Sequence, residues 1–138
     1  MEDRGPIHWI YPIVGGIIAE GITIALIAFV VALTGHGGPG PQGERIDPVA
    51  DKIGAVMAAT AGSLLCYVMG WWAARRAGGR FELHGTLVGA AAALLTLLGV
   101  VFGPPGQAVY YIVALIMKVV AASAGGRMAA RMAAAIQE

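Results

Sequence analysis

Residues 7–34 read IHWIYPIVGGIIAEGITIALIAFVVALT, an apolar run interrupted by one carboxylate, Glu20. A helix that crosses a bilayer needs about 20 largely apolar residues, and this run exceeds that length. Three further apolar runs lie at about residues 53–74, 83–102 and 108–126. The sequence therefore predicts an all-α polytopic membrane protein, with one domain, residues 1–138, built as a four-helix bundle.

The composition indicates that lipid is the solvent for most of the surface. Of the 138 residues, 58% are hydrophobic and 12% are charged, whereas soluble domains are about 25% charged. A soluble chain of this length has too little volume for its surface to bury so many apolar side chains. The net charge of +1 implies no general attraction to nucleic acid. The single cysteine, Cys66, excludes a disulfide within the chain.

The connections between the runs predict the orientation. Residues 35–48 form a glycine- and proline-rich outer loop, and the two later connections are short, which makes consecutive helices antiparallel neighbours. Four spans place six of the nine basic residues on one side of the membrane and two on the other. Because basic residues accumulate on the cytoplasmic side, we expect both termini in the cytoplasm, with residues 127–138 as a short tail.

Aromatic and small residues mark the surfaces of the predicted helices. Tryptophan and tyrosine are enriched where a helix leaves the hydrocarbon, which predicts interface anchors at Trp9, Tyr11, Trp71, Trp72, Tyr110 and Tyr111. Small residues at helical spacing allow close helix contact in lipid. They predict packed faces at Gly54, Ala58, Gly62, Cys66 and Gly70 in the second run and at Gly85 and Gly89 in the third. A second small face on the second helix leaves room for a homo-oligomer.

A weak internal repeat is compatible with a duplicated helical hairpin. Residues 70–77 and residues 126–133 both read G-x-x-A-A-R-x-A. Two such hairpins would share one orientation, with an axis along the membrane normal. A bias toward alanine, glycine and arginine produces the same pattern without duplication, so both interpretations stay open.

Glu20 and Lys118 are the ionisable residues that lie deep inside the predicted spans. Such a residue costs about 2.5–3.5 kcal/mol on insertion scales and usually has a partner. Glu20 lies nine residues after Tyr11, and Lys118 lies eight residues before Gly126, which gives depths of roughly 14 and 12 Å at ~1.5 Å per residue. We expect the two to meet, either as a structural salt bridge or as an ion, proton or polar-ligand site. The alternative is that one of them reaches the headgroups and they stay apart.

Thr23 and His84 are weaker candidates for such a site. Thr23 shares a helix face with Glu20. His84, near the start of its run, could titrate near neutrality, but a place at a helix start or among headgroups explains it equally well. His8, His36 and His84 lie far apart in the sequence and are not expected to form one site.

Motifs of the common enzyme classes are absent from the sequence. It has no P-loop, no G-x-S-x-G, no H-E-x-x-H and no C-x-x-C. We therefore expect no catalytic residues, no metal and no cofactor.

Residues 73–80, AARRAGGR, lead into HGTLVG at residues 84–89. This stretch resembles small four-helix bacterial membrane proteins of uncharacterised function. The resemblance covers roughly the second half of the chain and implies a four-helix bundle in the bacterial inner membrane, without an activity. Glu20 and Lys118 are not part of it.

Three functions are compatible with the sequence. The first is a non-enzymatic bundle that forms oligomers or binds a membrane-protein partner. The second is a minimal transporter or channel for an ion or small polar solute, which uses Glu20 and Lys118. The third is an accessory subunit of a larger membrane complex. A dry Glu20–Lys118 pair favours the first and third, whereas a water-filled cavity favours the second.

Single cysteines at Gly38 and Gly78, in a Cys66→Ala background, test the predicted topology. We expect an impermeant thiol reagent to label the Gly38→Cys variant in intact cells, and the Gly78→Cys variant only after the membrane is opened. Labelling of both positions from the same side would contradict four spans.

Overall fold

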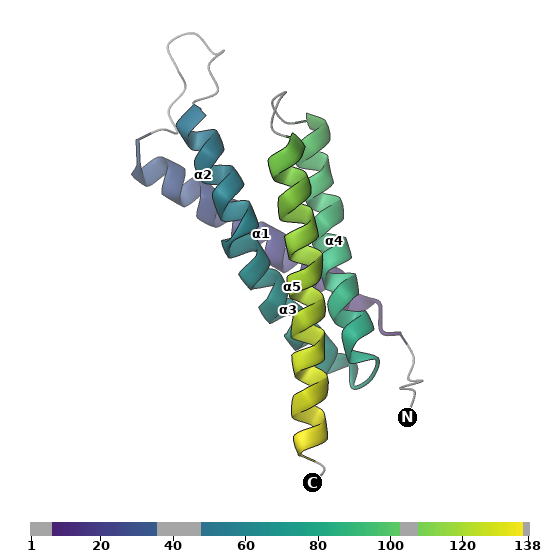
Figure 1. Cartoon of the computed structure of the whole chain (residues 1–138). Helices are drawn as coiled ribbons and strands as arrows, with labels where there is room; N and C mark the ends of the chain where they lie inside the picture. The colour runs from purple at the N-terminus through teal and green to yellow at the C-terminus, as the bar shows by residue number, and fades with distance from the viewer. Residues whose placement is uncertain (1–6, 36–47, 103–107, 137–138) are drawn as a thin grey trace.

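The computed structural model describes residues 7–35, 48–102 and 108–136. This part of the chain folds into helices without strands (Figure 1): α1 (Ile10–Leu33), α2 (Pro48–Ala59), α3 (Ala61–Ala77), α4 (Phe81–Phe102) and α5 (Ala108–Ala135). Four stretches of it are long and apolar enough to cross a membrane, because α2 and α3 together form one of them. The predicted all-α fold with four membrane-capable helices is thus confirmed. Most of the predicted outer loop, residues 36–47, lies outside the described residues.

The second membrane-capable helix includes residues before its predicted apolar run and is interrupted once. It begins at Pro48, ahead of the run at about residues 53–74, and the boundary between α2 and α3 falls at Thr60. The Thr60 hydroxyl donates a hydrogen bond of 2.7 Å to the Val56 carbonyl, an arrangement that bends helices. Backbone hydrogen bonds continue from Val56 through Thr60 to Leu64, so the chain keeps its direction.

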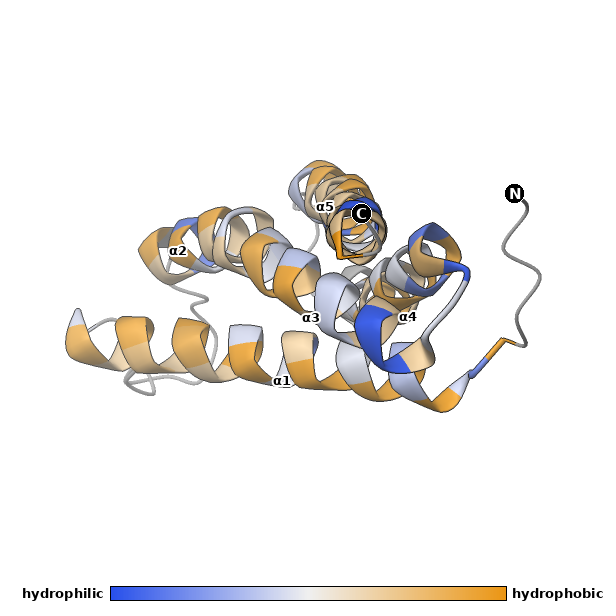
Figure 2. Cartoon of the chain, turned by 90° about the horizontal axis from the view of Figure 1, so that it is seen from below, coloured by the Kyte–Doolittle hydropathy of each residue, from blue (hydrophilic) through white to orange (hydrophobic). Residues whose placement is uncertain are grey.

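The helices are arranged as a three-layer sandwich. Helices α2, α3 and α4 form the middle, α1 packs on one side of them and α5 on the other (Figures 1 and 2). Among the described residues, α1 and α5 do not pack directly against each other. Any interaction between these two helices must therefore pass between α3 and α4.

The interior is built from small residues, and the large apolar side chains point outward. The core includes Ala19, Cys66 and Ala122, each fully buried, whereas Ile10 and Leu94 are each 66% exposed. Figure 2 shows hydrophobic colour on the outer side of α1. This distribution fits a chain whose surroundings are apolar, where close backbone approach rather than burial of large side chains holds the helices together.

Glycines allow the helix backbones to cross closely. A methyl group at Gly85 would lie 2.5 Å from the Ala122 carbonyl oxygen, and one at Gly70 would collide with that same carbonyl. Gly62 and Gly89 are buried as well. Gly54 differs from the other predicted packing positions, because its nearest neighbour would be a methyl group of Ile27 at 3.8 Å.

Helix α5 runs well beyond the predicted end of the fourth helix. The sequence places residues 127–138 in a tail, but α5 continues to Ala135. Gly125 and Gly126 do not end the helix. Gly125 meets the backbone of α3 at Tyr67, and a methyl group at Gly126 would lie 2.5 Å from the Phe81 carbonyl oxygen. The alanine-, methionine- and arginine-rich residues that follow have high helix propensity, which explains the continuation.

Gly85→Ala and Gly54→Ala form a matched pair that tests this packing. The new methyl group at Gly85 meets backbone atoms that cannot rotate away, so we expect a loss of ~1–3 kcal/mol of stability. At Gly54 the methyl group makes ordinary contact, and the gain in helix propensity should leave stability unchanged or raise it by ~0.5–1 kcal/mol. Denaturant unfolding in detergent measures both values. Equal effects would show that the Gly85 crossing is not a close contact in solution.

Candidate functional site

The predicted contact between Glu20 and Lys118 is confirmed as a buried salt bridge. The Lys118 ammonium donates to Glu20 Oε2 at 2.6 Å. The Lys118 side chain is fully buried and that of Glu20 is 10% exposed. Glu20 comes from α1 and Lys118 from α5, the two outer helices of the sandwich.

Thr96 of α4 completes the cluster. Its hydroxyl accepts a hydrogen bond of 2.7 Å from Lys118 Nζ and lies 3.2 Å from Glu20 Oε1 and 3.1 Å from the Ala92 carbonyl oxygen. Because a hydroxyl has one proton, it donates to only one of these two oxygens at a time. The carboxylate thus has a neighbouring donor at each oxygen, and three helices are joined through side chains.

Helix α3 supplies the space for the long Lys118 side chain. A methyl group at Gly62 would lie 2.9 Å from Lys118 Cε and 3.3 Å from Thr23 Cγ2. Glycine at this position therefore opens the route from α5 past α3 to α1. The predicted candidate Thr23 lines this route but does not bond to the pair, because its hydroxyl donates to the Ala19 carbonyl at 2.7 Å.

The polar groups of this cluster bond to one another. A charge in a low-dielectric interior is tolerated when it is paired and hydrogen-bonded. Here each charge has its counter-charge and a shared hydroxyl, and solvent reaches only a tenth of the Glu20 side chain. Such a pair gives weak net stabilisation but a strong preference for one arrangement, since a shifted helix would leave both charges unpaired.

His84 is fully buried and belongs to a second polar contact. Its Nδ1 lies 3.0 Å from the Arg80 carbonyl oxygen, and its Nε2 accepts the backbone N–H of His8 at 3.1 Å. The two imidazole rings are stacked, with centroids 6.5 Å apart. The sequence treats His8 and His84 as distant, yet α1 and α4 bring them together, and the contact fixes the start of α1 against α4.

The predicted interface anchors fall into two groups. Trp9 and Tyr110 are exposed at 56% and 61%, and their place at a membrane interface stays a prediction. Trp72, in contrast, packs edge-on against Tyr11 with ring centroids 6.1 Å apart. This second group therefore has a structural contact within the protein.

Thr96 is the site residue that the sequence does not reveal. Threonine is common in apolar helices and only the rotation of α4 decides which of its residues faces the pair. One signal is present, because the spacing from His84 to Thr96 equals that from His8 to Glu20. His8 bonds to His84 and Glu20 bonds to Thr96, so one alignment of α1 against α4 explains both contacts. Within the described residues, no group of three His, Cys, Asp or Glu side chains could hold a metal ion.

No family model, curated protein or solved structure matches the chain. The resemblance to small bacterial four-helix membrane proteins therefore stays a prediction.

A double-mutant cycle measures the coupling within the pair. Glu20→Gln leaves an ammonium without its anion, and Lys118→Met leaves a carboxylate without its cation. We expect each single change to cost ~3–5 kcal/mol and the double change to cost much less than the sum. Unfolding in detergent gives the four stabilities. Additive effects would mean that the two side chains do not interact.

Thr96→Val tests the hydroxyl separately. It removes a hydrogen-bonding partner of both Lys118 and Glu20 with little change in shape, and we expect a loss of ~1–3 kcal/mol. Thr86→Val is the matched control, because the Thr86 hydroxyl only bonds to the Glu82 carbonyl on an exposed part of the same helix. A similar loss in both variants would assign the Thr96 effect to local helix propensity.

Proposed function

We propose that the chain is a small, non-enzymatic protein of the bacterial cytoplasmic membrane that works by association with other transmembrane helices. In this proposal the four membrane-capable stretches cross the bilayer as an antiparallel bundle with both termini in the cytoplasm. The first partner to consider is a second copy of the chain. An accessory subunit would use the same kind of surface toward a different protein.

The buried Glu20–Lys118 pair is the observation that carries this proposal. A transporter needs a path by which water or a solute reaches its charged groups. Lys118 is fully buried, and its ammonium bonds to Glu20 and Thr96. The charges are therefore used to hold the helices in register, which leaves the outer surfaces for function.

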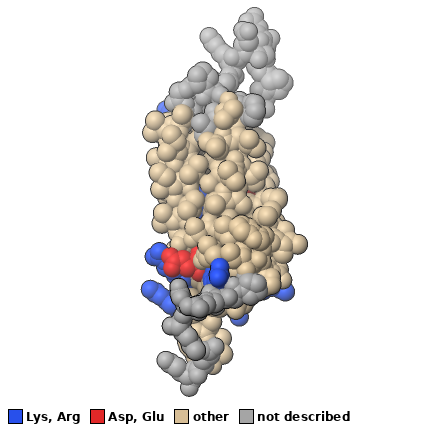
Figure 3. Space-filling view, turned by 90° about the vertical axis from the view of Figure 1, so that its right-hand side faces the viewer, with Lys and Arg blue, Asp and Glu red and all other residues tan. Residues whose placement is uncertain are grey.

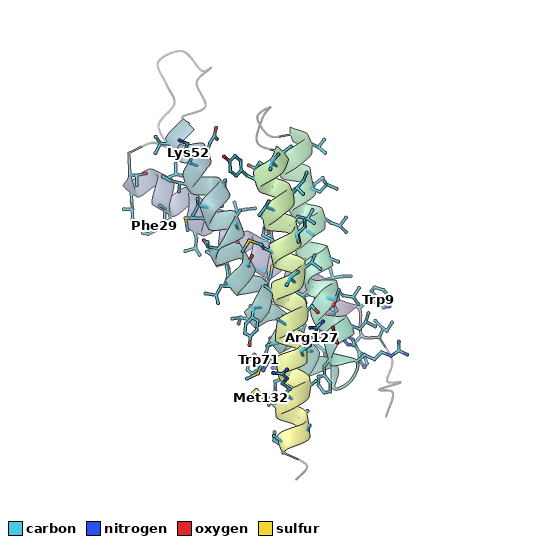
Figure 4. The ribbon with its side chains drawn as sticks, in the orientation of Figure 1. Trp9, Phe29, Lys52, Trp71, Arg127 and Met132 are labelled. Atoms are coloured by element: carbon cyan, nitrogen blue, oxygen red, sulfur yellow. The ribbon has the colours of Figure 1, made fainter. Side chains whose placement is uncertain are left out.

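The distribution of charge supports the membrane location and its orientation. Figure 3 shows few charged side chains along most of one face, with Lys, Arg, Asp and Glu gathered toward its lower end. Arginines at the end of α3 and in the last turns of α5 lie at this end, which we call the arginine-rich end: Arg75, Arg76, Arg127 and Arg131. Figure 4 places Lys52 near the opposite end. The excess of basic residues favours the cytoplasm for the arginine-rich end.

The outward face of α1 is the surface best suited to a second helix. Gly21 is exposed, and a methyl group there would have no neighbour within 4 Å. Ala25 is exposed one turn later, so the two form a small-xxx-small pair that the described part of the chain does not itself use. Such pairs allow two helix backbones to approach closely in lipid.

Self-association in liposomes tests this proposal. We expect wild-type chains carrying donor and acceptor dyes to show energy transfer, and Gly21→Leu to weaken it by about tenfold or more, since a bulky side chain holds the backbones apart. Leu64→Phe, at a 65% exposed position of α3, should leave it unchanged. A wild type that stays monomeric at high protein-to-lipid ratios would reject self-association.

Ion flux in the same liposomes separates this function from transport. We expect proton, sodium and potassium flux equal to that of empty liposomes, because the two charges are buried and bonded to each other. A flux that Glu20→Gln abolishes in a folded protein would instead identify a transporter.

A further inference from the structure

The arginine-rich end carries a hollow on the surface of α3. Trp71, Trp72, Arg75 and Arg76 line it, with a volume of about 330 Å³. Figure 4 places Trp71 on the opposite side of the bundle from Trp9, near the same end. The hollow is separate from the buried Glu20–Lys118 cluster and from the Gly21 face of α1.

Two guanidinium groups, those of Arg75 and Arg76, lie at this hollow. Arg75 lies over the Trp71 ring, with its guanidinium carbon 5.2 Å from the ring centroid. In the part of the chain that the structure describes, no carboxylate pairs with Arg75 or Arg76. Arg127 shows the contrast, because it forms a 2.6 Å salt bridge with Glu82. The hollow is therefore a local site of uncompensated positive charge.

A buried donor without an acceptor lies at the same place. Among the described atoms, Trp71 Nε1 is buried and has no hydrogen-bond partner. Buried N–H groups nearly always have an acceptor, but solvent does not reach this one, so a ligand in the hollow does not reach it either. The neighbouring Trp72 ring is held by its edge-on contact with Tyr11, which gives the hollow a fixed aromatic wall.

We propose that this hollow binds the phosphate group of an anionic phospholipid. The planar guanidinium groups of Arg75 and Arg76 match the geometry of phosphate oxygens. Tryptophan rings favour the headgroup level, so the two rings also offer an apolar wall to the glycerol and the upper acyl chain. Basic pockets on the cytoplasmic side of membrane helices are suited to anionic headgroups. A soluble phosphate shares the anionic chemistry but makes no use of this apolar wall.

Fluorescence quenching by brominated lipids tests the site on the whole chain. The chain has three tryptophans, so Trp9→Phe leaves Trp71 and Trp72 as the reporters. This protein is placed in phosphatidylcholine vesicles that contain a small fraction of either brominated phosphatidylglycerol or brominated phosphatidylcholine. We expect stronger quenching by brominated phosphatidylglycerol than by brominated phosphatidylcholine. Arg75→Gln/Arg76→Gln should lower this preference for phosphatidylglycerol by about tenfold.

Two controls separate the site from the general field of the arginine-rich end. Arg127→Gln/Arg131→Gln removes the same charge from α5 and should keep the preference. Trp71→Phe keeps an aromatic ring beneath Arg75 and removes an N–H that solvent does not reach, so it should keep the preference, as reported by Trp72. Equal quenching by both lipids in the wild type, or equal losses in the two double-arginine variants, would overturn the proposal.

Inorganic phosphate distinguishes the two sources of the anion. At millimolar concentration, inorganic phosphate should not relieve quenching by brominated phosphatidylglycerol. Relief would assign the site to a soluble anion. The inference rests on the proposed location in a bilayer, but different results would contradict the location and the lipid site. Absence of quenching by either lipid would contradict membrane insertion, whereas equal quenching by both would contradict only the lipid site.

Discussion

The contact between the Lys118 ammonium and the Glu20 carboxylate is the interaction on which the rest of the structure depends. It is 2.6 Å long, the Lys118 side chain is fully buried and that of Glu20 is 10% exposed. The two residues belong to α1 and α5, which do not pack on each other in the described part of the chain. The middle layer must therefore let a lysine side chain through, and it does so at Gly62. Thr96 then supplies the hydroxyl that both charges share.

The small residues of the core allow the Lys118 side chain to reach Glu20 across the middle layer. With glycine at the crossings of α3, α4 and α5, the backbones approach closely enough for side chains of the outer helices to meet across the middle layer. Larger residues would separate the layers, and the pair would either break or admit water. The large apolar side chains are consequently directed outward. The surfaces available for function are the outer face of α1 and the arginine-rich end of α3, rather than the interior.

The sequence predicts the four apolar helices from the lengths of the apolar runs. It predicts the Glu20–Lys118 pair from the equal depths of the two charges within those runs. A membrane-spanning helix has a fixed rise per residue, so two deep charges at equal depth are recognisable without a structure. The role of Thr96 and the His8–His84 contact depend on how each helix is rotated and on which helices are neighbours. The hydropathy pattern of the sequence gives no information on either. The length of α5 is underestimated because Gly126 has the appearance of a helix end. In the structure it is a crossing point, where a methyl group would lie 2.5 Å from the Phe81 carbonyl oxygen.

The most direct measurement of the central claim is the dipolar coupling between Lys118 Nζ and Glu20 Cδ in lipid. Lysine occurs twice in the chain, so Lys52→Arg leaves one labelled ammonium nitrogen for solid-state NMR with labelled glutamate carboxyl carbons. The account predicts a strong coupling, as required by a nitrogen 2.6 Å from a carboxylate oxygen, and little magnetisation transfer from water to that nitrogen. Absence of the coupling, or rapid exchange of the ammonium with water, would contradict a water-excluded pair that joins α1, α4 and α5.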